Sequence, residues 1–346
     1  MSLDITGRYR YPPPNPEWLA RYDEEIIDPD QSIVDAHHHI WVEGGSSYLL
    51  DDLVADLSAG HNVVATICVQ AHHGYRSDGH EELRCVGETE TIAALVATAR
   101  GLEIKQRVCA GFVAYADLSR GAAAAAVIQA HLAAAPGLVR GIRHGIGRDP
   151  LFPNGIVLRP APAAMLADPG YRAGLAEVAR HGLSYDAMLY HCQIPELTDM
   201  ANALPELPIV LDHFGCPIGV GPYEGHKDET FRVWSADMRK LARCPNVSVK
   251  LGGLGMTICG AKWHEDNRPP GSKELADAWQ PHFDTCIEAF GAERCMFESN
   301  FPVDKSQFSY RVLWNAYKRL VVGASPDQRA ALFHDTAARF YHLGLR

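Results

Sequence analysis

Three consecutive histidines end an apolar run in Ile33-Val-Asp-Ala-His-His-His-Ile-Trp41. Successive side chains of a strand point to opposite faces, so we expect Asp35, His37 and His39 on one side and His38 on the other. Two imidazoles spaced in this way can bind one metal ion, usually with a second group that orients each ring. A cluster of hydrogen-bonded structural histidines would give the same short pattern, so the neighbouring elements must distinguish the two.

Two further histidines stand at the ends of apolar runs. His191 closes Ser-Tyr-Asp-Ala-Met-Leu-Tyr-His, and His213 closes Pro-Ile-Val-Leu-Asp-His. Each alone is more often a structural residue, but together with His37 and His39 they suit a metal site or a general-base site. We favour His213 as the third metal ligand, because it directly ends its run and a turn with glycine and proline follows.

A carboxylate and an amide share one face of a later run, Met-Phe-Glu-Ser-Asn-Phe-Pro-Val-Asp, in which they are Glu298 and Asn300. A glutamate here can bind a metal ion and take the proton from an attacking water. Asn300 can offer a carbonyl oxygen but cannot act as a base. The alternative interpretation is a buried Glu298 that pairs with Lys250, near the end of the neighbouring run Val-Ser-Val-Lys-Leu.

Positive charge also converges on the ends of these runs. Arg143 lies near the end of Val-Arg-Gly-Ile-Arg-His, and an inward-pointing guanidinium can hold a carboxylate through two parallel hydrogen bonds. The alternative is a salt bridge to a neighbouring strand. Tyr75 lies in a long loop and can close over a substrate, although an ordinary solvated loop residue would fit equally well.

Short runs rich in valine, isoleucine and leucine alternate with longer helix-like stretches, which indicates parallel β/α units. The predicted strands are Ser32–His37, Val63–Gln70, Val108–Tyr115, Val139–His144, Leu183–Leu189, Ile209–His213, Val247–Leu251 and Cys295–Glu298. The predicted helices are Leu49–Ala59, Thr89–Arg100, Ala122–Ala134, Tyr171–His181, Ile194–Ala203, Phe231–Ala242, Leu275–Phe290 and Pro326–Tyr341. This α/β pattern predicts a single (β/α)8 TIM barrel, in which the loops after the strands build the active site.

Residues 1–31 are polar and proline-rich, and Tyr11-Pro-Pro-Pro-Asn-Pro excludes a helix or a central strand. We expect them to form an N-terminal arm in front of a barrel of residues 32–346. The arm either wraps its own barrel or contacts a second subunit, which leaves a homo-oligomer open. The same residues lack the apolar stretch of a signal peptide.

The bulk composition excludes several classes of protein. Apolar residues make up 47% and charged residues 21% of the 346 residues, as in globular proteins with a sizeable core. A net charge of −10 argues against nucleic acid or an acidic membrane as partner and leaves a small-molecule substrate. No run approaches the roughly 18 apolar residues of a membrane span. The nine cysteines include no C-x-x-C pair, which indicates reduced thiols in a cytoplasmic protein.

These motifs, in their order and spacing, resemble the amidohydrolase-related family of the amidohydrolase superfamily. The resemblance runs from about Ile33 to the C-terminus and rests on Asp35-x-His37-x-His39, Gly141-Ile-Arg143, Leu211-Asp-His213-Phe-Gly215, Lys250-Leu and Ser299-Asn-Phe-Pro302. The branch includes L-fuconolactonase-like sugar lactonases and the pyrone dicarboxylate lactonase. It implies a TIM barrel, a mononuclear metal site that some members lack, and hydrolysis of a lactone or related bond.

The sequence departs from the family motif at one position. The family's last strand carries Gly-Ser-Asp-Trp-Pro, whose aspartate is the base and, where metal is present, a ligand. Here the string is Glu298-Ser-Asn-Phe-Pro, which places Asn300 where the aspartate is expected.

From the residues and the resemblance together we expect a hydrolase of a small lactone or related ester or amide, carrying a carboxylate or several hydroxyls. Zn²⁺ or a similar divalent ion would be held by His37, His39 and His213, which would polarise the carbonyl themselves if no metal is bound. Water would be activated by Glu298 or His191, with Asn300 beside them, and the substrate bound by Arg143, Lys250, His191 and Tyr75. The alternatives are a metal-dependent non-oxidative decarboxylase and a barrel that binds a small anion without turning it over.

Overall fold

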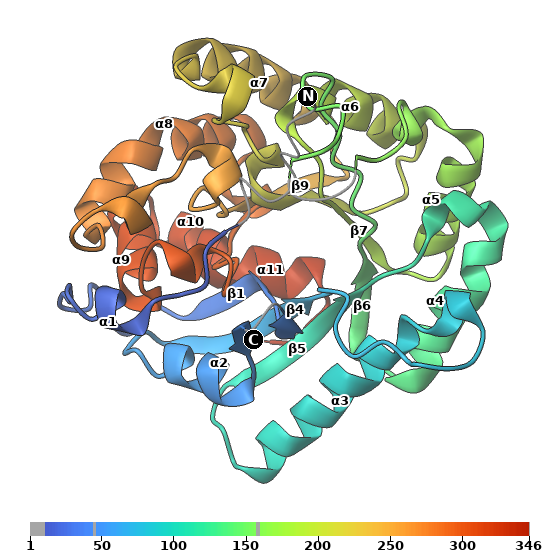
Figure 1. Cartoon of the computed structure of the whole chain (residues 1–346), viewed down its shortest axis with the longest axis horizontal. Helices are drawn as coiled ribbons and strands as arrows, with labels where there is room; N and C mark the ends of the chain where they lie inside the picture. The colour runs from blue at the N-terminus through green and yellow to red at the C-terminus, as the bar shows by residue number, and fades with distance from the viewer. Residues whose placement is uncertain (1–10, 44–45, 157–159, 346) are drawn as a thin grey trace.

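Eight parallel strands form one sheet in the computed structural model, which describes residues 11–43, 46–156 and 160–345. In their order around the sheet they are β1 (Ile33–His38), β4 (Val63–Val69), β5 (Arg107–Ala114), β6 (Val139–Ile142), β7 (Ser184–Ala187), β8 (Ile209–Leu211), β9 (Val247–Leu251) and β10 (Cys295–Phe297). Backbone bonds join the ends of the sheet: His39 N–H donates to Phe301 O at 2.7 Å and Asn300 N–H to His37 O at 2.8 Å. The predicted (β/α)8 TIM barrel and its eight strands are therefore confirmed (Figure 1).

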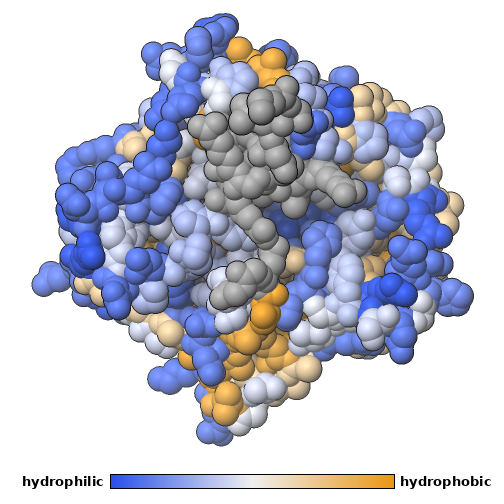
Figure 2. Space-filling model, in the orientation of Figure 1, coloured by the Kyte–Doolittle hydropathy of each residue, from blue (hydrophilic) through white to orange (hydrophobic). Residues whose placement is uncertain are grey.

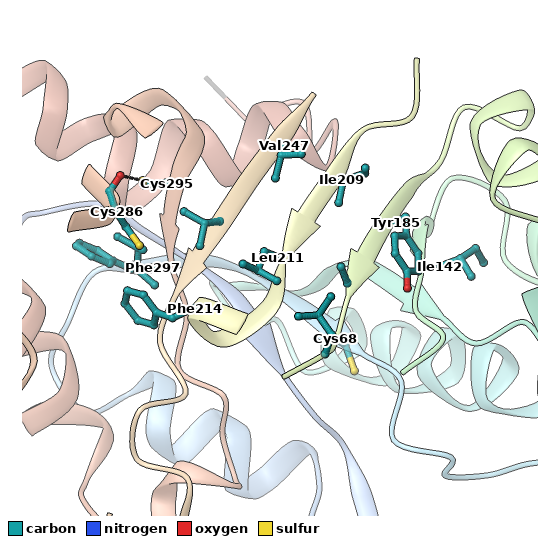
Figure 3. Packing of buried hydrophobic residues seen from close by; sticks show 14 of the residues in the cluster. Cys68, Ile142, Tyr185, Ile209, Leu211, Phe214, Val247, Cys286, Cys295 and Phe297 are labelled. Atoms are coloured by element: carbon teal, nitrogen blue, oxygen red, sulfur yellow. Dashed lines mark hydrogen bonds between the residues drawn. The ribbon is translucent and has the colours of Figure 1, made fainter. Parts of the chain in front are cut away.

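The strands are buried on both faces, which is why they read as nearly continuous apolar runs. The outward side chains, such as Tyr185, Leu211 and Val247, pack in the layer between barrel and helices (Figure 3). The inward side chains, including Val34, Ile67, Val113, Val210 and Met296, fill the interior. Polar groups are therefore concentrated beyond the apolar layers, where the strands end.

Helices surround the barrel, as Figure 1 shows. They are α2 (Leu50–Leu57), α3 (Val86–Gly101), α4 (Ala124–Ala134), α5 (Pro169–Arg180), α6 (Ile194–Ala203), α7 (Lys227–Leu241), α8 (Ser272–Phe290), α9 (Tyr310–Leu320), α10 (Pro326–Ala330) and α11 (Thr336–Phe340). The first seven confirm predicted helices, with ends that differ by a few residues.

The sequence interpretation was wrong near the C-terminus. The predicted helix Pro326–Tyr341 is divided into α10, a π-helical turn (Ala331–Asp335) and α11. Helix α9 was not predicted, because its aromatic residues are weak helix formers; Ser309 caps it by accepting a hydrogen bond from Val312 N. The short hairpin of β2 (Trp41–Glu43) and β3 (Ser46–Tyr48) was also not predicted.

The described part of the N-terminal arm, residues 11–31, lies on the chain's own barrel. Trp18 in the short helix α1 (Pro16–Leu19) is buried, and its Nε1 donates to Asp266 O at 2.8 Å. Further along, Lys318 Nζ on α9 donates to Asp28 O at 2.8 Å. A contact of the arm with a second subunit stays a prediction.

No helix in the described parts of the chain combines the length and apolar character needed to cross a bilayer. Figure 2 shows hydrophilic residues over most of one face of the molecule, with a smaller hydrophobic area near its lower edge.

The buried imidazole of His131 on α4 predicts a pH-dependent contribution to stability. Its Nδ1 bonds Thr89 Oγ1 at 2.6 Å, its Nε2 bonds Tyr115 O at 2.8 Å, and burial lowers its pKa to about 4. The pKa of a histidine in the unfolded chain is about 6.5. Between this pH and about 4, the unfolded chain therefore binds a proton on His131 that the folded chain does not bind. The stability advantage of wild type over His131→Gln should therefore shrink as the pH falls from about 6.5 to about 4, by at most about 3 kcal/mol.

Urea unfolding of both proteins across this pH range measures that difference. Comparing the two proteins cancels the contributions of all other titrating groups. A difference in unfolding free energy that stays constant between pH 7 and pH 4.5 would contradict the prediction.

Candidate active site

A single carboxylate links two of the predicted histidines at the carboxyl ends of the strands. Glu298, directly after β10, has its Oε1 2.7 Å from His213 Nδ1 and its Oε2 3.1 Å from His37 Nδ1. All three side chains are almost completely buried. An imidazole whose Nδ1–H donates a hydrogen bond to this carboxylate keeps a lone pair on Nε2. Metal-binding histidines are usually arranged in this way.

The third histidine is oriented in the same way by the backbone. His39 Nδ1 lies 2.8 Å from Val69 O, so its Nε2 also carries a lone pair, and this atom lies 3.1 Å from His37 Nε2. Two ligand nitrogens at about 2.0–2.1 Å from one ion are separated by about this distance. His37 Nε2 and His39 Nε2 therefore fit one divalent metal ion, and the His213 ring lies beside them with its centre 4.5 Å from that of His37.

Backbone irregularities bring these side chains together. The pairing of β1 with β4 shifts register between Asp35 and His38, which breaks the alternation of faces. At the other side of the site β8 ends at Leu211, and His213 follows in a left-handed conformation with φ 54°. Such backbone is sparsely populated and concentrates at functional sites. Gly253 packs so closely on His213 that an added Cβ would lie 2.6 Å from Nδ1.

The predicted facing of Asp35 toward the site is wrong. Its carboxylate accepts hydrogen bonds from Ser299 N–H at 2.8 Å and from the Tyr310 hydroxyl at 3.0 Å. Asp35 therefore supports the backbone next to the site and connects it to helix α9. The register shift that turns His37 toward Glu298 accounts for this difference.

Asp212 is a site residue that the sequence analysis did not single out. It is fully buried, and its Oδ1 lies 3.0 Å from Lys250 Nζ and 3.7 Å from His37 Nδ1. Its Oδ2 lies 3.6 Å from Arg143 Nη1. With His37 and His213 it forms a group whose ligand atoms lie within 4.8 Å of one another. The available signal was its position directly before His213 at the end of an apolar run.

Lys250 is a buried ionic centre beneath the histidines. Its Nζ lies 2.7 Å from Asp186 Oδ2, 3.0 Å from Asp212 Oδ1 and 3.2 Å from His37 Nδ1. The alternative pairing of Glu298 with Lys250 is therefore not what the structure shows, since the oxygens of Glu298 contact histidines. A fully buried cation with two carboxylate partners orients its neighbours and is not exposed to a substrate from solvent.

Arg143 is a second cation beside the histidine pair. Its Nη1 lies 3.4 Å from His37 Nε2, its Nη2 donates to Gln70 O, and its buried Nε has no hydrogen-bond partner in the described chain. Asn300 lies at the same rim, but its Nδ2 donates to Asp304 Oδ1 at 3.0 Å.

The two remaining predicted residues make their hydrogen bonds outside this cluster. His191 Nδ1 accepts a hydrogen bond from Ile218 N–H at 3.3 Å, and its ring packs on Tyr223. Tyr75 bonds His72 Nδ1 at 2.8 Å in the loop after β4. In the described chain no hydrogen bond joins either residue to His37, His39 or His213.

The electrostatics favour the neutral form of His37 and His39, whereas at His213 the effect of burial is outweighed by Glu298, which raises the pKa of that imidazole. Burial, reinforced by Lys250, lowers the pKa of His37 to about 4, and burial together with His37 lowers the pKa of His39. Burial alone would raise the pKa of Glu298, but the imidazoles of His213 and His37 lower it to about 2. Neutral imidazoles are the form that binds metal, and an ionised Glu298 is the form that orients them.

A tyrosine from the C-terminal end of the chain supports the ionic centre. The Tyr341 hydroxyl donates to Asp186 Oδ2 at 2.6 Å, and Lys250 Nζ lies 5.5 Å from the centre of the Tyr341 ring. We expect Tyr341→Phe to lower the free energy of unfolding by about 1–3 kcal/mol, because a buried carboxylate loses a donor. Chemical denaturation checks this, with Tyr115→Phe as control because its hydroxyl has no hydrogen bond in the described chain. Equal stability of Tyr341→Phe and wild type would contradict the assignment.

A parallel barrel with histidines and carboxylates gathered at the carboxyl ends of its strands defines the class of the protein, a (β/α)8-barrel enzyme. The family model described as Amidohydrolase matches residues 34–343, and the chain belongs to this family. It is an enzyme of the amidohydrolase superfamily, in the branch that the sequence motifs predicted.

Known proteins are similar to this chain over half or more of its length. Uncharacterized protein y4mH of Sinorhizobium fredii is 31% identical over 337 residues, which cover 91% of this chain and 99% of that protein. L-fucono-1,5-lactonase of Burkholderia multivorans is 30% identical over 182 residues, which cover 52% of this chain and 58% of the lactonase. A crystal structure of an amidohydrolase from Burkholderia multivorans with bound zinc has a TM-score of 0.66 and 25% identity, covering 90% of this chain and 99% of its own.

Proposed function

We propose that the protein hydrolyses a small lactone, or a related ester or amide, that carries a carboxylate or several hydroxyls. The observation that carries the proposal is the Glu298 carboxylate between His37 Nδ1 and His213 Nδ1, which prepares both Nε2 atoms for a metal ion. The likeness to a sugar lactonase over half of the chain supports the choice of bond.

His37, His39 and His213 would hold the metal, for which Zn²⁺ is our choice because a similar amidohydrolase structure contains it. When bound, such an ion polarises a carbonyl and lowers the pKa of a coordinated water. Three neutral imidazoles and an accessible fourth position are the usual ligand set of a catalytic zinc.

The residues around the histidines would perform the proton and charge transfers. Asp212 is our candidate for the base, because its carboxylate is held by the charges of Lys250 and Arg143 without well-directed hydrogen bonds. It would accept the proton of the attacking water on Oδ2. Glu298 is better suited to orient imidazoles, because one of its oxygens lies against His213 Nδ1 and the other against His37 Nδ1.

Arg143 would bind the carbonyl oxygen and stabilise the negative charge that develops on it. Arg143 is 8% exposed and its guanidinium lies beside the histidine pair, where a bound substrate would reach it. Lys250 would keep Asp212 ionised and in place instead of contacting substrate directly. Donors placed at a developing oxyanion are typically worth roughly a hundredfold or more in rate.

A panel of sugar lactones and carboxylated lactones, monitored by acid release at constant pH, tests the proposal. We expect the wild type to hydrolyse at least one lactone of the panel, and we expect this activity to be lost in His37→Ala/His39→Ala. The same protein is offered aromatic and dienoic acids with detection of carbon dioxide. Carbon dioxide release without acid release from any lactone would favour a decarboxylase. Thermal stabilisation by small carboxylates with no reaction at all would favour a binding barrel; either result would contradict the proposal.

A further inference from the structure

A second group of metal-binding side chains lies behind the active site, on the opposite face of β1. His38 Nε2, Cys68 Sγ and Cys109 Sγ lie within 4.8 Å of one another, and all three side chains are at most 1% exposed. They come from the adjacent strands β1, β4 and β5 and face the layer between barrel and helices, in which Figure 3 shows Cys68. The proposed hydrolytic reaction uses none of them.

Irregular backbone in all three strands brings this group together. The pairing of β1 with β4 shifts register between Asp35 and His38, and that of β4 with β5 between Ala65 and Ile67. Cys109 has φ 47° inside β5, a left-handed conformation that costs free energy for a residue with a Cβ. Its N–H donates to Thr66 Oγ1 at 2.9 Å instead of joining the sheet. Bulges of this kind redirect side chains, and here they direct a thiol toward an imidazole and a second thiol.

The histidine of this group is oriented as a ligand. His38 Nδ1 lies 3.4 Å from His39 O, which leaves Nε2 facing Thr66 Oγ1 at 2.9 Å and Cys109 Sγ at 3.9 Å. The Cys109 thiol therefore lies within reach of the same ion as His38 Nε2.

We propose that His38, Cys68 and Cys109 bind a second divalent metal ion of the zinc class, independent of the ion in the active site. Binding forms two metal–thiolate bonds and one metal–imidazole bond, and the two thiol protons pass to solvent. Two thiolates neutralise the charge of Zn²⁺, so the assembly can be buried without a further counter-ion. Thr66 Oγ1 is the nearest oxygen for the fourth position.

The burial and position of this site indicate a structural role. A fully enclosed ion has no open position for a substrate, as in structural zinc sites. It would join β1, β4 and β5 at His38, between the two proposed catalytic ligands His37 and His39. A cavity of about 470 Å³ at the start of β5 includes Cys109 among its lining residues.

Cobalt absorption tests this site separately from the active site. His37, His39 and His213 have no cysteine in contact within the described chain, so thiolate-to-Co²⁺ charge-transfer absorption reports only the second site. We expect this absorption in reduced wild-type protein loaded with Co²⁺ and its loss in Cys68→Ser/Cys109→Ser. The matched control is Cys286→Ser/Cys295→Ser, a second buried cysteine pair without a histidine, which should keep the absorption. The proposal would be overturned if the charge-transfer absorption is absent from Co²⁺-loaded wild type, or if it persists in Cys68→Ser/Cys109→Ser.

A second measurement needs no cysteine substitution. His37→Ala/His39→Ala should retain about one zinc per chain, with two sulfur neighbours in its X-ray absorption spectrum. This result would stand even if no lactone is hydrolysed, so the two proposals can fail separately. A zinc-free variant, a zinc ion with nitrogen and oxygen neighbours only, or a Cys68–Cys109 disulfide in the freshly purified protein would each contradict the second site.

Discussion

Asp212→Asn should lower kcat/KM by roughly 10²–10⁴-fold while leaving the protein folded, because an amide cannot accept the proton of the attacking water. The substitution keeps the size of the side chain and removes only its charge. Three imidazoles remain to hold the ion, so metal content should change little. Steady-state kinetics on the best lactone of the panel measure the effect, and circular dichroism confirms the fold.

The neighbouring Asp186 provides a matched control. Asp186 and Asp212 both contact Lys250 Nζ, but Asp186 also binds the Tyr341 hydroxyl beneath the ionic centre. Asp186→Asn should therefore lower stability and change kcat/KM by less than about tenfold. Equal losses of activity in the two variants would show that only the charge balance around Lys250 matters, and Asp212 would not be the base.

Glu298→Gln should weaken binding of the active-site metal by about 10–100-fold, the usual effect of removing a group that orients metal-binding histidines. The carboxylate places one oxygen 2.7 Å from His213 Nδ1 and the other 3.1 Å from His37 Nδ1, whereas an amide can offer an oxygen to only one of the two imidazoles. Competition with a chelating dye measures the affinity of the protein for its active-site ion, which is the ion that is missing from His37→Ala/His39→Ala.

Glu88→Gln is the control for this effect. Glu88 is also a buried glutamate, in helix α3, but it accepts from Ala71 N–H and His73 N–H and has no hydrogen bond to His37, His39 or His213 within the described chain. We expect wild-type metal affinity in Glu88→Gln. An unchanged affinity in Glu298→Gln would mean that the carboxylate does not prepare the imidazoles for metal.

The fold was readily predictable because strand runs such as Val63–Val69 and Val247–Leu251 are apolar throughout and bounded by polar turns. The position of the histidines was predictable for a related reason. The carboxyl ends of all barrel strands meet at one rim, so polar residues at these ends lie near one another. Helix α9 could not be recognised in this way. Its stability comes from burial of aromatic residues such as Trp314 and Tyr317, which a local propensity does not register.

The exact composition of the site required the structure. Strict alternation along a strand places Asp212 and His213 on opposite faces, yet both belong to the site because β8 ends at Leu211 and a left-handed turn follows. The same alternation places Asp35 with His37, and the register shift in β1 separates them. A prediction from alternation assumes that the strands are regular. The side chains of this site lie at positions where the backbone of β1 and the turn after β8 are irregular.

Elemental analysis of wild type and of His37→Ala/His39→Ala, purified in parallel, tests whether these histidines hold a catalytic metal ion. We expect the variant to contain about one divalent ion per chain fewer than wild type, and we expect this ion to restore lactone hydrolysis when it is returned to chelated wild-type protein. Equal metal content in the two proteins, or full activity of wild type after complete removal of metal, would contradict a metal-dependent site formed by His37, His39 and His213.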